Sequence, residues 1–102
     1  MKVLFVCSGG MSSAIAIKAL QEEGAKNNIE MEVLAVGAVE FEDQIKDGYD
    51  IAMVAPQIRH KSKGFMEIGK QVGVPVINII PQGYSPLGGK ILLKQLRETL
   101  SI

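Results

Sequence analysis

The chain has 102 residues, of which 47% are hydrophobic, and this is enough for one folded domain with its own core. Its eleven basic and eleven acidic residues balance to a formal net charge of zero, which argues against binding to nucleic acid or to an anionic membrane surface. The apolar runs are far shorter than the ~20 residues that a membrane-spanning helix needs. We therefore expect one soluble domain over residues 1–102, with no nucleic acid partner and no direct insertion into a membrane.

Four short segments rich in Val and Ile have the nearly continuous apolar character of strands in a parallel sheet. In chain order they are Lys2–Val6, Met31–Val36, Ile51–Ala55 and Val76–Ile80. The first segment is also too short for the apolar part of a signal peptide and leads into a glycine-rich turn, so we expect a cytoplasmic protein. Each of the four strands is expected to be buried on both faces.

Segments with helical periodicity separate and follow these strands. The positions that share a helical face are Ala16, Ile17, Leu20 and Gly24, then Phe65, Ile68, Gly69 and Val72, and finally Leu92, Leu93, Leu96 and Leu100. A weaker helix is predicted near Val39–Lys46. Strands that alternate with helices predict parallel pairing through right-handed crossovers. The fold class is therefore α/β, with a four-stranded parallel sheet in the order 2-1-3-4 and helices on both faces.

This strand order places a topological switch point beside the first strand, where ligands bind at the carboxyl ends of the strands. Four loops follow a carboxyl end and are expected at this edge. They are Cys7–Met11, Gly37–Val39, Pro56–Lys63 and Pro81–Gly89. The residues of these loops are the first candidates for a functional site.

Cys7 is the strongest of these candidates because it ends the first strand, directly before a Gly-Gly turn and a helix start. Free N–H groups at a helix start stabilise a thiolate and can bind a phosphoryl group, and Gly9 and Gly10 permit the close approach. Ser12 and Ser13 fit either phosphate contact or simple helix capping. A buried cysteine can also be an inert small hydrophobe, but this location favours function.

The presence of only one cysteine excludes several kinds of site and reaction. It forms no internal disulfide, and without a cluster of His and Cys there is no zinc site, so no metal is expected. A phosphatase loop of the form Cys-x5-Arg needs arginine at position 13, where Ser13 stands. A redox device needs a second cysteine as resolving partner. Transfer of a phosphoryl group between two partners is the chemistry that these residues favour.

Three stretches resemble a known family. They are VLFVCSGGMSSA, MVAPQIRH and VPVINIIPQGY. Together they resemble the enzyme IIB component of the lactose/cellobiose (chitobiose) class of the bacterial sugar phosphotransferase system, over essentially the whole chain. The motif Cys-x-x-Gly-Met-Ser at Cys7–Ser12 is its most specific element. The fold that the resemblance implies is similar to that of the low-molecular-weight tyrosine phosphatases.

The resemblance implies that Cys7 accepts a phosphoryl group from a phosphohistidine of a IIA partner and passes it to a sugar held by a membrane-embedded IIC component. A β-disaccharide similar to cellobiose is the expected sugar, without any metal or other cofactor. The phosphate loop then consists of Ser8, Gly9, Gly10, Met11, Ser12 and Ser13. The protein is expected to be a monomer, associated peripherally with the membrane through IIC.

The resemblance also points to residues that face these partners. They are Pro56, Gln57, Arg59, His60 and Tyr84. Ala55 replaces a glycine that is usual in the family, and His60 replaces a tyrosine, which raises the question of a proton-transfer role or a second phosphoryl role for the only histidine. A basic rim with Lys61 and Lys63 is the simpler interpretation of His60. A thiol phosphatase or a regulatory domain of the same fold remains the alternative for the chain as a whole.

Overall fold

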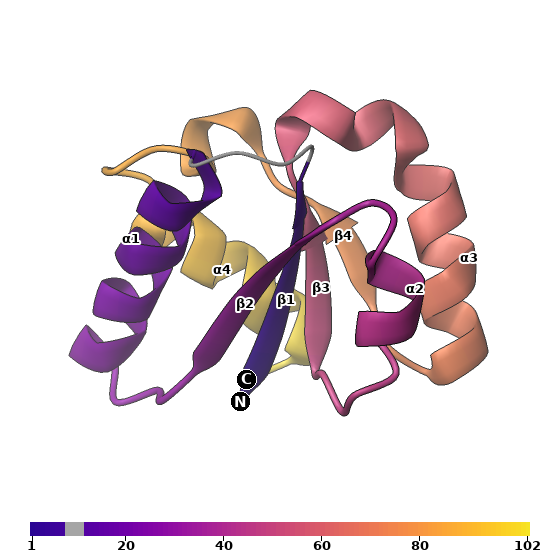
Figure 1. The fold of residues 1–102 in the computed structure, drawn as a ribbon. Helices are drawn as coiled ribbons and strands as arrows, with labels where there is room; N and C mark the ends of the chain where they lie inside the picture. The colour runs from indigo at the N-terminus through magenta and orange to yellow at the C-terminus, as the bar shows by residue number, and fades with distance from the viewer. Residues whose placement is uncertain (8–11) are drawn as a thin grey trace.

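Four parallel strands form the sheet at the centre of the molecule (Figure 1). The computed structural model describes residues 1–7 and 12–102. The strands are β1 (Lys2–Cys7), β2 (Glu32–Gly37), β3 (Ile51–Val54) and β4 (Val76–Asn78), and they lie side by side in the order β2-β1-β3-β4. All three pairings are parallel, so the predicted strand order and orientation are confirmed.

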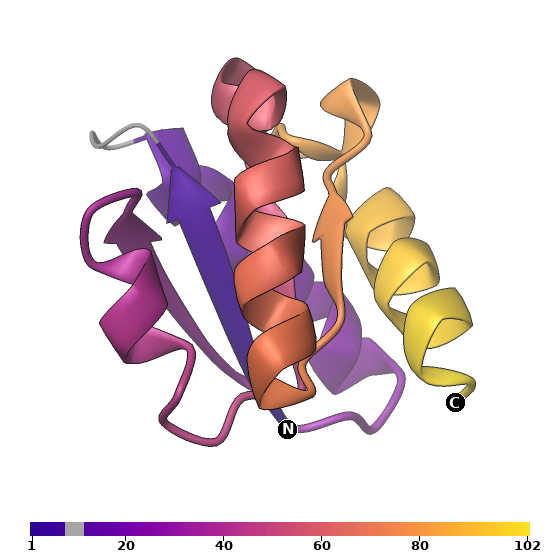
Figure 2. The same cartoon turned by 90° about the vertical axis from the view of Figure 1, so that its right-hand side faces the viewer.

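Helices cover both faces of this sheet, as predicted (Figure 2). The elements are α1 (Ser12–Lys26), α2 (Phe41–Gln44), α3 (Ser62–Val72) and α4 (Gly89–Leu100), with short 3-10 helices η1 (Pro56–Lys61) and η2 (Pro81–Gly83). Helices α1 and α4 pack on one face, and α2 and α3 pack on the other. Within the described part of the chain, every helix is too short or too polar to cross a membrane.

The expectation that every strand is buried on both faces is correct for β1 and β3 and wrong for β2 and β4. Val3, Leu4, Phe5 and Val6 of β1 are fully buried, and so are all four residues of β3. In contrast, Val33 is the only buried residue of β2, and β4 has no buried residue. The difference arises because β2 and β4 are the two edges of the sheet, and because α2 has only four residues and covers little of β2.

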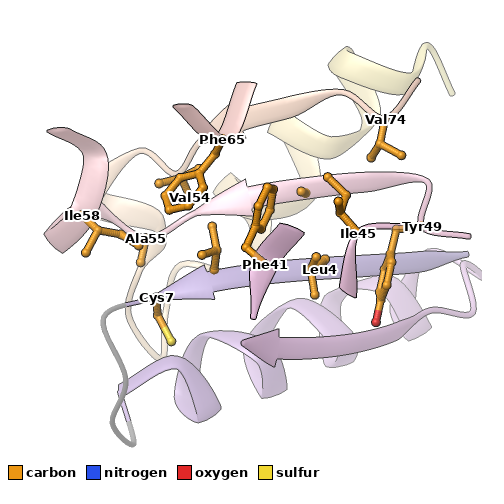
Figure 3. Close-up of a cluster of buried hydrophobic side chains, with 12 residues drawn as sticks. Leu4, Cys7, Phe41, Ile45, Tyr49, Val54, Ala55, Ile58, Phe65 and Val74 are labelled. Atoms are coloured by element: carbon orange, nitrogen blue, oxygen red, sulfur yellow. The ribbon is translucent and has the colours of Figure 1, made fainter. Parts of the chain in front are cut away.

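The face under α2 and α3 contains one continuous cluster of apolar side chains, drawn in Figure 3. At its centre the rings of Phe41 and Phe65 lie 4.8 Å apart between centroids, tilted by 58°. This tilted arrangement suits the electrostatics of two aromatic rings, and it joins the start of α2 to the first turn of α3. The pair therefore ties together the two segments that follow β2 and β3.

The outer edge of β4 is covered by a side chain of α4. The Gln95 amide donates a hydrogen bond to the carbonyl of Asn78 at 2.8 Å and accepts one from the N–H of Ile80 at 3.0 Å. These are the two backbone groups that a neighbouring strand would bind at this position. The amide of Gln95 thus takes the place of a fifth strand beside the carboxyl end of β4.

Candidate functional site

Cys7 is the last residue of β1, an inner strand, and lies at the carboxyl edge of the sheet as predicted. Only 7% of the residue is exposed, and its Sγ donates a hydrogen bond of 3.7 Å to the carbonyl oxygen of Val36 on β2. Figure 3 shows the sulfur turned away from Ala55 on the other side. A carbonyl oxygen only accepts hydrogen bonds, so this contact belongs to the neutral thiol and is lost when the thiol ionises.

Helix α1 begins at Ser12, close in sequence to Cys7, and runs back along the sheet. Ser13 is buried, with 5% of its surface exposed, and no buried side-chain oxygen or nitrogen in the described part of the chain lacks a hydrogen-bond partner. The other members of the expected phosphate loop include Ser8, Gly9, Gly10 and Met11, and these four lie outside the described residues. Position 13 therefore holds a buried serine at the place where a phosphatase loop needs arginine.

The segment after β3 was expected to be a loop, and it forms the 3-10 helix η1, which continues into α3. Proline suits the first position of such a helix because it has no N–H to leave unpaired. The side chain of Ile58 turns inward and belongs to the same buried cluster as Cys7, while Gln57, Arg59 and His60 are exposed and Pro56 is half-buried. The structure thus places three predicted partner-facing residues on the outside of a segment that is anchored beside Cys7.

Tyr84 follows η2, at the same edge. It is half-buried and packs against the apolar clusters on both faces of the sheet. The cluster on the α3 face includes Cys7, so Tyr84 and the nucleophile candidate share one packed environment. The segment from β4 to α4 was also expected to be a loop, and it contains one short 3-10 helix.

The segment between β2 and α2 contains two features that sequence analysis did not single out. Val39 is 91% exposed at this edge. Glu40 folds its carboxylate back over Gly37, so that a Cβ added to Gly37 would lie only 2.8 Å from Oε2 of Glu40. Gly37 is the residue paired in register with Cys7 on the neighbouring strand. The glycine at the end of a strand beside the cysteine is the one signal in the sequence that could have drawn attention to this segment.

Charges of opposite sign stand on the two sides of Cys7, because β1 lies between β2 and β3. The segment after β2 and the start of α2 carry Glu40, Glu42 and Asp43. The segment after β3 carries the basic rim, which we define as Arg59, His60, Lys61 and Lys63. All seven residues are exposed, so the site lies between an acidic flank and a basic flank.

A large hollow in the described part of the chain lies away from Cys7. It has a volume of about 1100 Å³, is open to solvent and lies at the amino ends of the strands, between α1 and β2. Met1, Glu30 and Glu32 are among its lining residues, which include no cysteine, serine, threonine or histidine. Among residues 1–7 and 12–102, no three side chains of His, Cys, Asp or Glu come together as metal ligands would. The residues that could carry out chemistry therefore lie at the edge that holds Cys7 and not in this hollow.

Comparisons of the sequence and of the structure with known proteins lead to the same family. The family described as "PTS system, Lactose/Cellobiose specific IIB subunit" matches residues 2–95. The structure is similar to the lactose-specific IIB domain of the Streptococcus pneumoniae phosphoenolpyruvate:carbohydrate phosphotransferase system, with a TM-score of 0.77 and 21% identity over 92% of this chain and 95% of that one. It is also similar to the solution structure of the cellobiose-specific phosphotransferase IIB component of Borrelia burgdorferi, with a TM-score of 0.75 and 26% identity over 99% and 92% of the two chains. A search of curated proteins found no match.

Proposed function

The chain belongs to the lactose/cellobiose-specific IIB family of the sugar phosphotransferase system, and from this premise we propose that Cys7 is the residue on which it carries the phosphoryl group. Membership makes the protein a phosphoryl carrier, and IIB domains work with IIA and IIC partners. The observation that supports Cys7 is its position. It is the only cysteine of the chain and ends an inner strand at the switch point of the sheet.

The proposed reaction consists of two transfers. In the first, the thiolate of Cys7 attacks the phosphorus of a phosphohistidine on IIA, so that an S–P bond forms while the N–P bond breaks and the imidazole keeps the electron pair. In the second, a hydroxyl of a cellobiose-like β-disaccharide on IIC attacks, an O–P bond forms, the hydroxyl proton leaves and the sulfur keeps the electrons of the S–P bond. A thiolate is a good leaving group, which suits a carrier that must release what it accepts.

The segment after β1 is proposed to bind the transferred phosphoryl group. Its members are Ser8, Gly9, Gly10, Met11, Ser12 and Ser13. Backbone N–H groups before and at the start of α1 would supply the hydrogen bonds, and the positive end of the helix dipole would add about 0.3–1 kcal/mol for an exposed anion. This modest stabilisation fits a carrier better than a tight binding site, because the group has to leave again.

The partner proteins are proposed to dock over the edge that holds Cys7. Pro56, Gln57, Arg59, His60 and Tyr84 lie at this edge and are the proposed contacts. The protein would work in the cytoplasm as a monomer and meet the membrane only through IIC. Because Cys7 is 7% exposed and belongs to the packed face under α3, each partner has to approach it from this edge.

We expect the wild-type protein to gain one phosphoryl group when it is incubated with phosphoenolpyruvate, the general phosphotransferase components and a matching IIA. The gain is read from the intact mass. The phosphorylated protein should also resist alkylation by iodoacetamide, because its only thiol is then occupied. The control omits IIA and should leave the protein unmodified and fully alkylated.

Two results would contradict this proposal. A protein that stays unmodified with several IIA partners is not a carrier for them, and a protein that gains the phosphoryl group but is still alkylated carries it on another residue. Continuous hydrolysis of an aryl phosphate in the absence of any donor protein would favour the thiol phosphatase instead.

The basic rim gives a second prediction about docking. Arg59→Glu is expected to slow phosphoryl transfer from IIA roughly 3- to 10-fold at low salt, because the approaching phosphohistidine is an anion and the substitution reverses a charge beside its target. Lys70→Glu is the matched control, since Lys70 is exposed on the same side of the sheet but lies near the end of α3, away from Cys7. Transfer rates are measured over a range of salt concentrations. An Arg59→Glu variant that behaves like Lys70→Glu at low salt would show that the basic rim does not guide the donor.

A further inference from the structure

The side chain of Glu40 occupies an unusual position. Glu40 is the residue directly before α2, but its side chain makes no hydrogen bond to the start of that helix. Its carboxylate instead lies over Gly37, with Oε2 2.8 Å from the place where a Cβ on Gly37 would stand. Only glycine leaves room for this arrangement, so the carboxylate and the glycine form one local structure.

This structure lies beside the proposed nucleophile. Gly37 and Cys7 are paired in register on neighbouring strands. Because neighbouring parallel strands are separated by about 4.8 Å, the Glu40 carboxylate lies within about 8 Å of the Cβ of Cys7. It is therefore close enough to interact electrostatically with any charge that Cys7 carries, even where solvent screens the interaction.

Among the described residues, no cationic side chain forms an ion pair with Glu40. The ion pairs within the described residues join Lys26 to Glu23 and Lys94 to Glu98, and both lie on the other face of the sheet. The basic rim lies on the opposite side of Cys7, across β1 and β3. A phosphoryl group on Cys7 would thus lie between the Glu40 carboxylate, which has no ion pair within the described residues, and the basic rim.

We propose that Glu40 tunes how readily phosphorylated Cys7 gives up its phosphoryl group, by electrostatic repulsion in the phosphorylated state. Phosphorylation replaces a neutral thiol or a single thiolate charge by a group of charge close to −2, so the carboxylate raises the free energy of the phosphorylated protein more than that of the free protein. Glu40 is in this sense a positioning residue, which acts through the charge on Cys7 without forming a bond to the reacting atoms. The proposal rests on Cys7 being the phosphorylated residue.

The quantity that reports this effect is the equilibrium distribution of phosphoryl groups between IIA and the protein. It is measured at protein concentrations low enough that the complex is negligible. Under these conditions the equilibrium constant compares only free proteins, so a change in docking affinity or in transfer rate does not alter it. A purely structural role of Glu40 in docking would therefore leave the constant unchanged.

Glu40→Gln is expected to shift this equilibrium toward the phosphorylated protein by roughly 3- to 10-fold, with the shift shrinking in concentrated salt. Glu42→Gln is the matched control, because it makes the same change of net charge two residues further along, in the first turn of α2, where Glu42 is exposed and makes no contact with Gly37. Gly37→Ala is a second variant that leaves the carboxylate in the chain but displaces it, and it should shift the equilibrium in the same direction by less.

The outcomes separate this inference from the proposed function. If the wild-type protein takes no phosphoryl group on Cys7, the proposed function fails and this inference fails with it. If the wild-type protein is phosphorylated on Cys7 but Glu40→Gln and Glu42→Gln give the same constant, only the role of Glu40 is wrong. Glu40→Asp should give a constant between those of the wild-type protein and Glu40→Gln, because it keeps the charge but shortens its reach.

Discussion

Replacing Cys7 by serine is expected to abolish phosphorylation of the protein by IIA, lowering the transfer rate by at least about 10⁴-fold. A serine hydroxyl occupies nearly the same space but stays protonated at neutral pH, so it offers no anionic nucleophile. No described neighbour supplies a base in its place, since the side-chain hydrogen bond of Cys7 within the described residues goes to the carbonyl oxygen of Val36, which is not a general base. The rate is measured as incorporation of phosphate from phosphoenolpyruvate.

A second variant, Cys7→Ala, separates this loss of chemistry from a loss of structure. Cys7 is small and buried at the end of a strand, so alanine should fit with little change in the free energy of unfolding. We expect both variants to unfold at nearly the same denaturant concentration as the wild-type protein. If Cys7→Ala is folded and still phosphorylated, the acceptor lies elsewhere, and His60, the only histidine, is the first residue to test.

Gly69→Ala should destabilise the fold by about 1–3 kcal/mol, a large share of the ~5–15 kcal/mol that is typical of a whole domain. Gly69 lies on the buried side of α3, and an added Cβ would stand 2.5 Å from the carbonyl oxygen of Val74 and 2.5 Å from Cγ2 of Val76. Both distances are far below contact, and one of the two atoms belongs to the backbone. Helix α3 would have to move away from β4 to make room.

Gly64→Ala is the matched control in the same helix. An added Cβ there meets no atom within 4 Å, so the substitution should stabilise the helix by about 0.5–1 kcal/mol through its higher helix propensity. Chemical denaturation measures both variants. Equal effects of the two substitutions would show that α3 is not held against β4 as closely as described, and would contradict this account of the packing.

The sheet order and the crossing helices could be predicted from the sequence because they depend on repeated local patterns. Apolar runs such as Ile51–Ala55 alternate with helical periodicity, and the right-handed crossover rule then leaves few topologies. The exposure of β2 was not predicted, since its run of Val33, Leu34 and Val36 looks the same as that of a central strand. What differs is the length of α2, and a four-residue helix gives almost no periodic signal.

For the site, the sequence predicted the position of Cys7 but not its surroundings. The location of Cys7 could be predicted because the apolar strand before it and the glycine pair after it are adjacent to it in the sequence. The carboxylate of Glu40 comes near Cys7 only through the pairing of Gly37 with Cys7 on another strand. Such a contact depends on the register of two strands and on the direction of one flexible side chain, and neither is encoded in a short motif.

Gln95 also limits how these molecules can associate with one another. A strand from a second molecule that approaches β4 would have to break the two hydrogen bonds that the Gln95 amide makes with Asn78 and Ile80. Growth of a continuous sheet through many molecules requires two open edges on each of them. Since one edge is occupied in this way, β2 is the side left for such pairing, and two molecules that meet there form a closed pair that cannot extend into a fibre.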